Sequence, residues 1–263
     1  MIILQRVVLL CAVIAASPAS SFAQTGFADV VDHIHLAAPD QAKAVEWYRA
    51  HFGAEATPEG PDRAMLGTTR LIFQKSDMPK PSAGSILGAI GFSVPDLDGA
   101  VKKLQADGVK MVMPPMVMQG IRSAQVIDPW GTMIDVVQDP KKLGLHHITL
   151  ATPDPAATLA WFAGAFGGKV AKYENAMDGI NYGGVWLFAT RGNGEPSAGH
   201  SIDHIGFRPV NVDASVAAMK AKSVKVTTEP RPLVLPSGTA MRLAFIEAPG
   251  GVRIELVQRD NLK

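Results

Sequence analysis

Histidines and carboxylates recur at matching places in the two halves of this chain. The first half carries them in three short apolar segments, Asp32-His33-Ile34-His35-Leu36, Ala89-Ile90-Gly91-Phe92 and Ile134-Asp135-Val136-Val137-Gln138. The second half repeats the pattern as His146-His147-Ile148-Thr149-Leu150, His204-Ile205-Gly206-Phe207 and Ile254-Glu255-Leu256-Val257-Gln258. Two histidines and a carboxylate form a recurring ligand set for catalytic divalent metals. The second half has the full set, whereas the first has Ala89 in place of one histidine.

A short amphipathic helix is predicted after the first strand of each half. Pro39-Asp40 and Pro153-Asp154 each supply an aspartate suited to cap a helix. Apolar residues then recur at helical spacing, at Val45, Tyr48 and Phe52 and at Leu159, Phe162 and Phe166. Gly53 and Gly167 follow as stops. A second helix is predicted in each half, with Asp96 and Asn211 as its caps.

Strands are predicted around these helices. The clearest are 70–74, 124–127, 134–138, 185–190, 243–247 and 252–258. Each half is thus two strand–helix–strands units, and the chain contains four. The predicted fold class is α+β, with four βαβββ modules paired into two tandem domains, 24–139 and 140–263. Each domain is expected to have a curved sheet that encloses a cleft, with residues 139–144 as the linker.

These landmarks resemble the vicinal oxygen chelate superfamily. The "DHIxL" strand at 32–36, the Pro-Asp helix start, "HIGF" and the closing Pro249, Gly251 and Glu255 carry the resemblance. The superfamily includes glyoxalase I, extradiol dioxygenases, fosfomycin-resistance proteins, methylmalonyl-CoA epimerase and bleomycin-binding proteins. The resemblance covers essentially all of the chain after residue 23 and implies the glyoxalase-like fold.

The resemblance also implies a metal site in the second half. It implies that His147, His204 and Glu255 converge there on a divalent metal, Fe²⁺, Mn²⁺, Zn²⁺ or Ni²⁺, with open positions for substrate oxygens. A metal-free descendant is the alternative.

The first half is expected to hold a degenerate site, because Ala89 cannot ligate a metal. His33, His35 and Asp135 remain there, and His35 shares a strand face with His33 and is the candidate for a substitute ligand.

Four further residues are candidates for substrate binding. Arg208 and Arg253 share strand faces with His204 and Glu255, where they could bind an anionic substrate, or they lie at strand ends in solvent. Trp186 and Phe188 are expected either to line the pocket or to belong to the core.

Departures from the superfamily patterns narrow the chemistry, and no catalytic residue is assigned. Strand 185–189 has no Glu or Gln, the fourth ligand and base of glyoxalase I, and Phe245 replaces a tyrosine of the extradiol signature. Both reactions are therefore disfavoured. The predicted function is Lewis-acid chemistry, lyase-like or dioxygenase-like, on a small oxygen-bearing substrate. The alternative is non-catalytic sequestration of a small molecule, as in bleomycin resistance.

The N-terminus and the composition indicate where the protein acts. Residues 1–23 read as a signal peptide with cleavage after Ala23, which predicts a periplasmic or secreted protein without stable membrane association. Cleavage would remove the single cysteine, Cys11. A net charge of +1 without a Lys/Arg cluster argues against nucleic-acid binding. The expected partner is a small molecule, and the sequence does not determine the oligomeric state.

Overall fold

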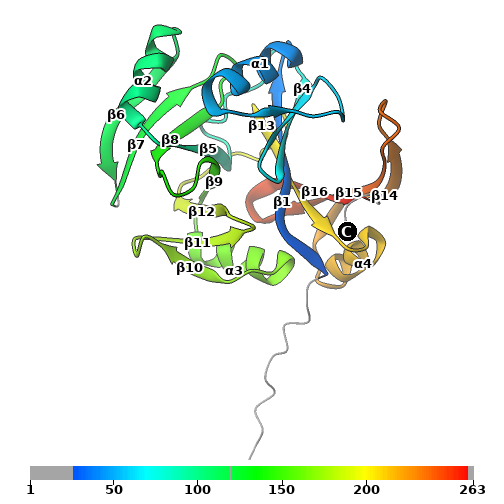
Figure 1. Ribbon diagram of the computed structural model, residues 1–263. Helices are drawn as coiled ribbons and strands as arrows, with labels where there is room; N and C mark the ends of the chain where they lie inside the picture. Colours follow the sequence, from blue (N-terminus) through cyan, green and yellow to red (C-terminus); the bar gives the residue numbers. More distant parts are fainter. Residues whose placement is uncertain (1–25, 119, 260–263) are drawn as a thin grey trace, which may run out of the picture.

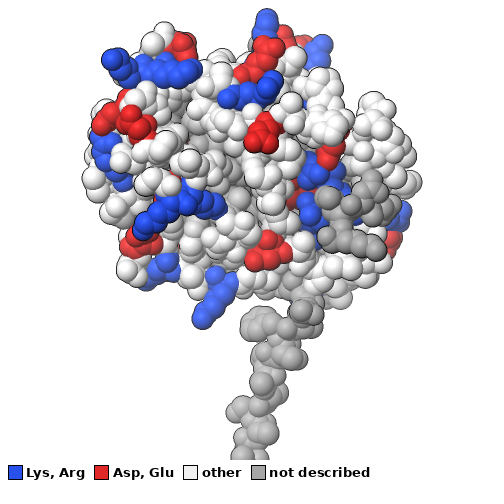
Figure 2. Space-filling view, viewed as in Figure 1, with Lys and Arg blue, Asp and Glu red and all other residues white. Residues whose placement is uncertain are grey.

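The computed structural model describes residues 26–118 and 120–259 (Figure 1). The predicted signal peptide, with its cleavage site after Ala23, lies outside the described residues. Among the described helices, none is long and apolar enough to cross a membrane. On the face shown in Figure 2, Lys and Arg are interspersed with Asp and Glu and form no large patch of one sign.

The described chain consists of four modules, each a strand, a helix and three further strands. Module one contains β1 (Phe27–Ala38), α1 (Gln41–Phe52), β2 (Glu55–Ala56), β3 (Arg63–Leu66) and β4 (Thr69–Lys75). Module two contains β5 (Leu87–Val94), α2 (Leu97–Ala106), β6 (Lys110–Met118), β7 (Ile121–Ile127) and β8 (Met133–Gln138). Module three contains β9 (Gly144–Thr152), α3 (Pro155–Phe166), β10 (Val170–Tyr173), β11 (Met177–Tyr182) and β12 (Val185–Arg191). Module four contains β13 (Ile202–Pro209), α4 (Val212–Ala221), β14 (Lys225–Val234), β15 (Ala240–Ala248), the short 3₁₀ helix η1 (Pro249–Gly251) and β16 (Val252–Arg259).

The helices begin where the sequence predicts. The side chains of Asp40, Asp96, Asp154 and Asn211 each accept a hydrogen bond from the backbone N–H three residues later. Gly53 ends α1 in the left-handed region, with φ 69°. The βαβββ pattern of the modules is therefore confirmed.

The modules pair into two eight-stranded sheets, but not in the expected combination. Sheet I, with the order β14-β15-β16-β13-β1-β4-β3-β2, joins modules four and one. Sheet II, with the order β10-β11-β12-β9-β5-β8-β7-β6, joins modules three and two. The expectation that each half closes its own sheet and cleft is thus wrong, and segment 139–144 connects two modules of the same sheet. All four modules present equivalent first strands, so the repeat pattern fits either pairing.

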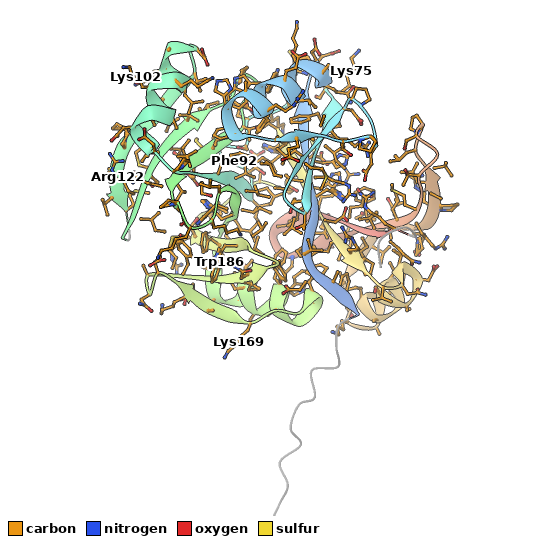
Figure 3. The ribbon with its side chains drawn as sticks, in the orientation of Figure 1. Lys75, Phe92, Lys102, Arg122, Lys169 and Trp186 are labelled. Atoms are coloured by element: carbon orange, nitrogen blue, oxygen red, sulfur yellow. The ribbon has the colours of Figure 1, made fainter. Side chains whose placement is uncertain are left out.

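Within each half, the two modules contact each other through a helix. Phe52 of α1 stacks on Phe92 of β5, with ring centroids 4.3 Å apart, and Figure 3 shows Phe92 in the interior. Phe166 of α3 stacks in the same way on Phe207 of β13, at 4.1 Å. The apolar faces of α1 and α3 therefore lie between the two sheets and join them. The sheet faces that point away from these helices are available for clefts.

Candidate metal centre

The register of three strands in sheet I brings histidines from both halves together. β1 runs antiparallel to β13, with His35 opposite His204 and His33 opposite Gly206. β13 runs parallel to β16, where Gly206 lies beside Glu255. Residues opposite one another on neighbouring strands share a sheet face, so these side chains gather on one face.

His33, His35, His204 and Glu255 form a compact cluster. One potential ligand atom from each lies within 4.8 Å of all the others. The Nε2 atom of His33 is 3.2 Å from Oε2 of Glu255, and Nε2 of His204 is 3.1 Å from the same oxygen. His35 stacks on His204 with centroids 4.2 Å apart. His33, His204 and Glu255 are buried, and His35 is half-buried.

The cluster has the features of a divalent metal site. His33 Nδ1 is 2.9 Å from Asp32, and His204 Nδ1 is 2.6 Å from Asp203. Carboxylates that hold one imidazole nitrogen in this way leave the other nitrogen free for a metal. His35 Nδ1 is buried without a hydrogen-bond partner, and His33 Nε2 is buried with only the Glu255 carboxylate beside it, which fits both atoms to a ligand role. Three imidazoles and a carboxylate suit Fe²⁺, Mn²⁺, Zn²⁺ or Ni²⁺.

The charges of the cluster are strongly coupled. Burial alone would raise the pKa of Glu255, but His33 and His204 hold it well below its usual range, so the carboxylate is ionised. Burial opposes protonation of His33, but Glu255 and Asp32 raise its pKa above the usual value. Burial together with His204 and His33 lowers the pKa of His35, which keeps this ring neutral. Neutral imidazole and ionised carboxylate are the forms that bind metals, so His35 and Glu255 fit directly, whereas a metal would displace the proton that Glu255 and Asp32 favour on His33.

Gly206 provides the space in which the cluster forms. A Cβ at this position would lie 2.1 Å from Cε1 of His33, because the imidazole packs directly over the glycine backbone. The glycine of the "HIGF" segment is therefore a steric requirement of the site.

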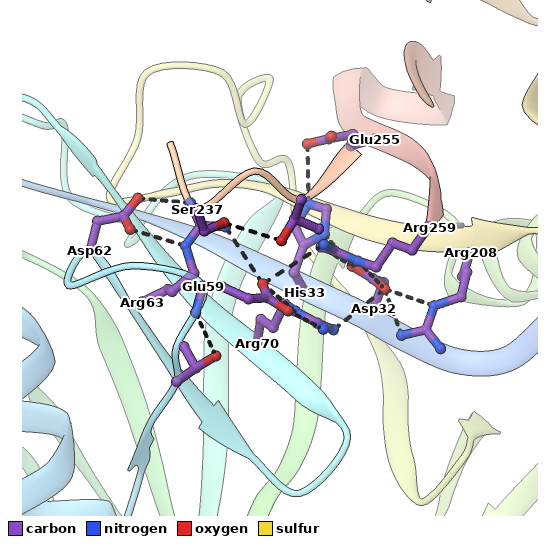
Figure 4. A network of polar contacts seen from close by, with 12 residues as sticks. Asp32, His33, Glu59, Asp62, Arg63, Arg70, Arg208, Ser237, Glu255 and Arg259 are labelled. Atoms are coloured by element: carbon purple, nitrogen blue, oxygen red, sulfur yellow. Dashed lines mark hydrogen bonds and ion pairs between the residues drawn. The ribbon is translucent and has the colours of Figure 1, made fainter. Parts of the chain in front are cut away.

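A network of ion pairs surrounds Asp32, the carboxylate that holds His33 (Figure 4). Asp32 is fully buried and accepts hydrogen bonds from Arg208 and Arg259 as well as from His33. Burial would raise the pKa of Asp32, but His33 and Arg259 hold it well below its usual range. Arg70 lies 3.7 Å from the same carboxylate and pairs with Glu59.

His147 does not join this cluster, which corrects the predicted ligand set. It lies on β9 in sheet II, where its Nε2 is 3.1 Å from Asp135. His204 and Glu255 do come together, and the third member of the set is His33, with His35 beside it. Asp135, expected near His33, lies with His147 instead. His33 takes the place predicted for His147 because module four pairs with module one and not with module three.

The cleft of sheet II repeats the geometry with different residues. There Gly91 pairs with His147 and with Asp135, and Ala89 pairs with Thr149. His147, Asp135, Ala89 and Thr149 thus occupy the positions that His33, Glu255, His204 and His35 hold in sheet I. Ala89 and Thr149 remove two ligands, so the degenerate cleft is that of His147.

The four candidate substrate-binding residues separate into two groups. Arg208 pairs with Asp32, and Arg253 pairs with Asp203 at 2.7 Å, so both support carboxylates that hold the histidines. Arg253 also lies over the Phe245 ring, with its guanidinium carbon 4.3 Å from the centroid. Phe188 and Trp186 lie on β12 in sheet II, and Phe188 packs against His147.

Sequence reasoning missed the two aspartates that orient the ligands. Asp32 and Asp203 each stand immediately before a ligand histidine. The repeated Asp-His pair was the available signal. Arg259, Arg70 and Glu59 carried no comparable signal, because the network that joins them exists only once β1, β4 and β16 are assembled.

Comparison with known proteins agrees with this fold. A family model described as Glyoxalase/Bleomycin resistance protein/Dioxygenase superfamily matches residues 30–136 and 144–256. The chain belongs to this superfamily. Its members bind small-molecule substrates and use divalent metals, and the two matched segments coincide with the two sequence repeats.

Individual relatives are more distant. A putative lactoylglutathione lyase of Brassica oleracea var. gemmifera is 30% identical over 140 residues, 48% of either protein, so the match spans about half its length. Glyoxalase I from Zea mays has a TM-score of 0.67 at 20% identity, covering 87% of this chain and 92% of the maize chain. A putative dioxygenase from Bacillus subtilis has a TM-score of 0.60 at 14% identity, covering 89% of this chain and 86% of the other. These structures share the fold.

Proposed function

We propose that this protein is a metal-dependent enzyme whose single metal centre is shared between the two halves of the chain. His33 and His35 from β1, His204 from β13 and Glu255 from β16 would hold the ion. The observation that carries the proposal is this convergence of four potential ligand groups, three of them buried, with a buried His35 Nδ1 that has no hydrogen-bond partner.

The bound ion would supply Lewis-acid catalysis, polarising an oxygen of a small substrate. The chain itself fixes the ligands: Asp32 and Asp203 orient two imidazoles, and Arg208 and Arg253 hold those carboxylates in place. Such outer partners typically contribute about 10- to 100-fold to metal affinity.

The substrate is proposed to carry an anionic oxygen near the metal. Arg253 precedes Glu255 by two residues and therefore lies on the same face of β16. Its side chain is 36% exposed, so one edge of the guanidinium stays available for a carboxylate while the other pairs with Asp203.

The experiment is metal loading followed by a substrate screen. The full chain, charged separately with Mn²⁺, Fe²⁺, Ni²⁺ and Zn²⁺, is assayed against thiol hemithioacetals, hydroxy acids and catechols. Turnover that requires metal and is lost in Glu255→Gln but kept in Asp135→Asn supports the proposal. Stoichiometric binding without turnover of any class would instead assign the protein to non-catalytic sequestration.

Export is proposed separately. Residues 1–23 are expected to be removed after Ala23, which would deliver the enzyme to the periplasm or the medium. N-terminal sequencing of protein recovered from the periplasmic fraction tests this, with Gln24 as the expected first residue. Full-length protein retained in the cytoplasm would contradict it.

A further inference from the structure

The cleft of sheet II contains a partly open cavity of about 400 Å³. Its walls are mainly apolar, with Met118, Met133, Met177 and Phe188 among the lining residues. The volume lies within the range of small-molecule sites, and flexible methionines adapt to ligands of different shape. Phe188 is fully buried and fixes one wall.

One charged group faces this apolar space. Of the described residues that line the cavity, Asp135 is the only carboxylate. Gln125 donates to its Oδ1 at 2.8 Å, and His147 Nε2 lies 3.1 Å from its Oδ2. A carboxylate has about four acceptor positions, so two remain for a ligand.

A chain of polar side chains lies behind Asp135. Tyr173 is 2.9 Å from His146 Nε2 and 3.3 Å from Asp139, and the Nδ1 atoms of His146 and His147 are 2.8 Å apart. Burial lowers the pKa of His146 to about 3, so this ring is neutral. Among the described residues that line the cavity, none is a lysine or arginine that pairs with Asp135, so a cationic partner other than a histidine would have to come from a ligand.

The two clefts differ in whether an arginine precedes the carboxylate. In sheet I, Arg253 lies on β16 two residues before Glu255, opposite Glu247 of β15 in the strand register. The residue two positions before Asp135 in sheet II is Met133, which lines the cavity. The second cleft therefore has a carboxylate without the neighbouring arginine.

We propose that the sheet II cleft is a second ligand site, which binds a small organic cation with an aromatic or aliphatic body. Asp135 would accept hydrogen bonds from the ammonium group, the methionines would enclose the apolar part, and the Phe188 ring would face the bound cation. The site is separate from the proposed metal centre and does not depend on metal.

Three naphthalene probes of similar size test the charge requirement. The full chain is titrated by calorimetry with 1-naphthylmethylamine, 1-naphthylmethanol and the carboxylate anion 1-naphthaleneacetate at neutral pH. One amine is expected to bind per chain, about tenfold or more tighter than the alcohol, because a charged hydrogen bond is stronger than a neutral one. The acetate is expected not to bind.

Variants then place the probe. Asp135→Asn should weaken the amine to the level of the alcohol and leave the alcohol unchanged, while Glu255→Gln, the matching change in sheet I, should leave amine binding intact. Thr149→Phe should exclude both probes, since the equivalent position in sheet I already holds the His35 ring. Amine binding no tighter than the alcohol, unaffected by Asp135→Asn, or lost in Glu255→Gln would overturn the proposal. Thermal unfolding checks each variant, and Thr149→Phe provides the test if Asp135→Asn does not fold.

Discussion

His33 in the first half of the chain packs its imidazole directly over the backbone of Gly206 in the second half. The two residues are paired across β1 and β13, and a Cβ at Gly206 would stand 2.1 Å from the His33 ring. One ligand position is therefore set by a glycine more than 170 residues away along the chain, as the residue numbers show.

Gly206→Ala should displace His33 and weaken metal binding. The added methyl group meets the ring rather than a flexible side-chain end, so the ligand must move. We expect at least a tenfold loss of metal affinity, measured by competition with a chelating dye. Gly91→Ala is the matched control, because its Cβ would strike His147 at 2.0 Å in the other cleft. Equal losses in both variants would contradict the assignment.

A second metal site should be obtained by restoring two residues in sheet II. Ala89 and Thr149 are paired there as His204 and His35 are paired in sheet I. The double variant Ala89→His, Thr149→His would place two imidazoles beside His147 and Asp135. Metal analysis should rise from one to two equivalents per chain. A value that stays at one in a folded double variant would show that the two clefts differ in more than these ligands.

Asp32→Asn should destabilise the fold more than Asp203→Asn. Asp32 compensates Arg208 and the almost fully buried Arg259, with side-chain exposures of 20% and 4%. Removal of one member of a buried ion pair typically costs about 3–5 kcal/mol of unfolding free energy. Asp203 pairs with the more exposed Arg253, so water can replace part of that interaction. Urea unfolding of both variants measures the difference, and equal losses would oppose this ranking.

Asp128 should contribute more to the free energy of unfolding at acid pH than at neutral pH. Tyr48 donates to this carboxylate at 2.8 Å, and burial raises the pKa of Asp128 above its usual value. The native state then holds the proton more tightly than the unfolded state. This contribution is present below the unfolded pKa and is lost as the pH rises through the folded pKa.

Asp128→Asn mimics the protonated acid and should not show that loss. The stability of the variant relative to the wild type should therefore increase between about pH 4 and pH 7, measured by urea unfolding at each pH. A relative stability that is constant over this range, or that decreases, would contradict the raised pKa. Other carboxylates, such as Asp32 and Glu255, have the opposite dependence but are common to both proteins.

Much of the fold could be predicted because each module carries its own local signals. Asp40 and Asp154 mark helix starts, and Phe52 and Phe166 mark helix faces that do pack as expected. These signals act within about 15 residues. They define a module but not its partner in the sheet.

The site could be predicted only in part for the same reason. His204 and Glu255 belong to one module, so the repeat was enough to place them together. The third ligand depends on whether β13 pairs with β1 or with β9, and His33 and His147 have the same sequence surroundings. The comparison of the two repeats also assigned Ala89, which replaces a ligand histidine, to the cleft of His33. In the structure, Ala89 faces the cleft of His147.

Metal stoichiometry of two single variants tests the shared metal centre most directly. The full chain, loaded with Zn²⁺ or Mn²⁺ and freed of excess ion, is compared with His33→Ala and His147→Ala by elemental analysis. We predict one equivalent in the wild type, one in His147→Ala and a near-complete loss in His33→Ala. Retention of the metal in folded His33→Ala, with loss in His147→Ala, would contradict a centre built from β1, β13 and β16.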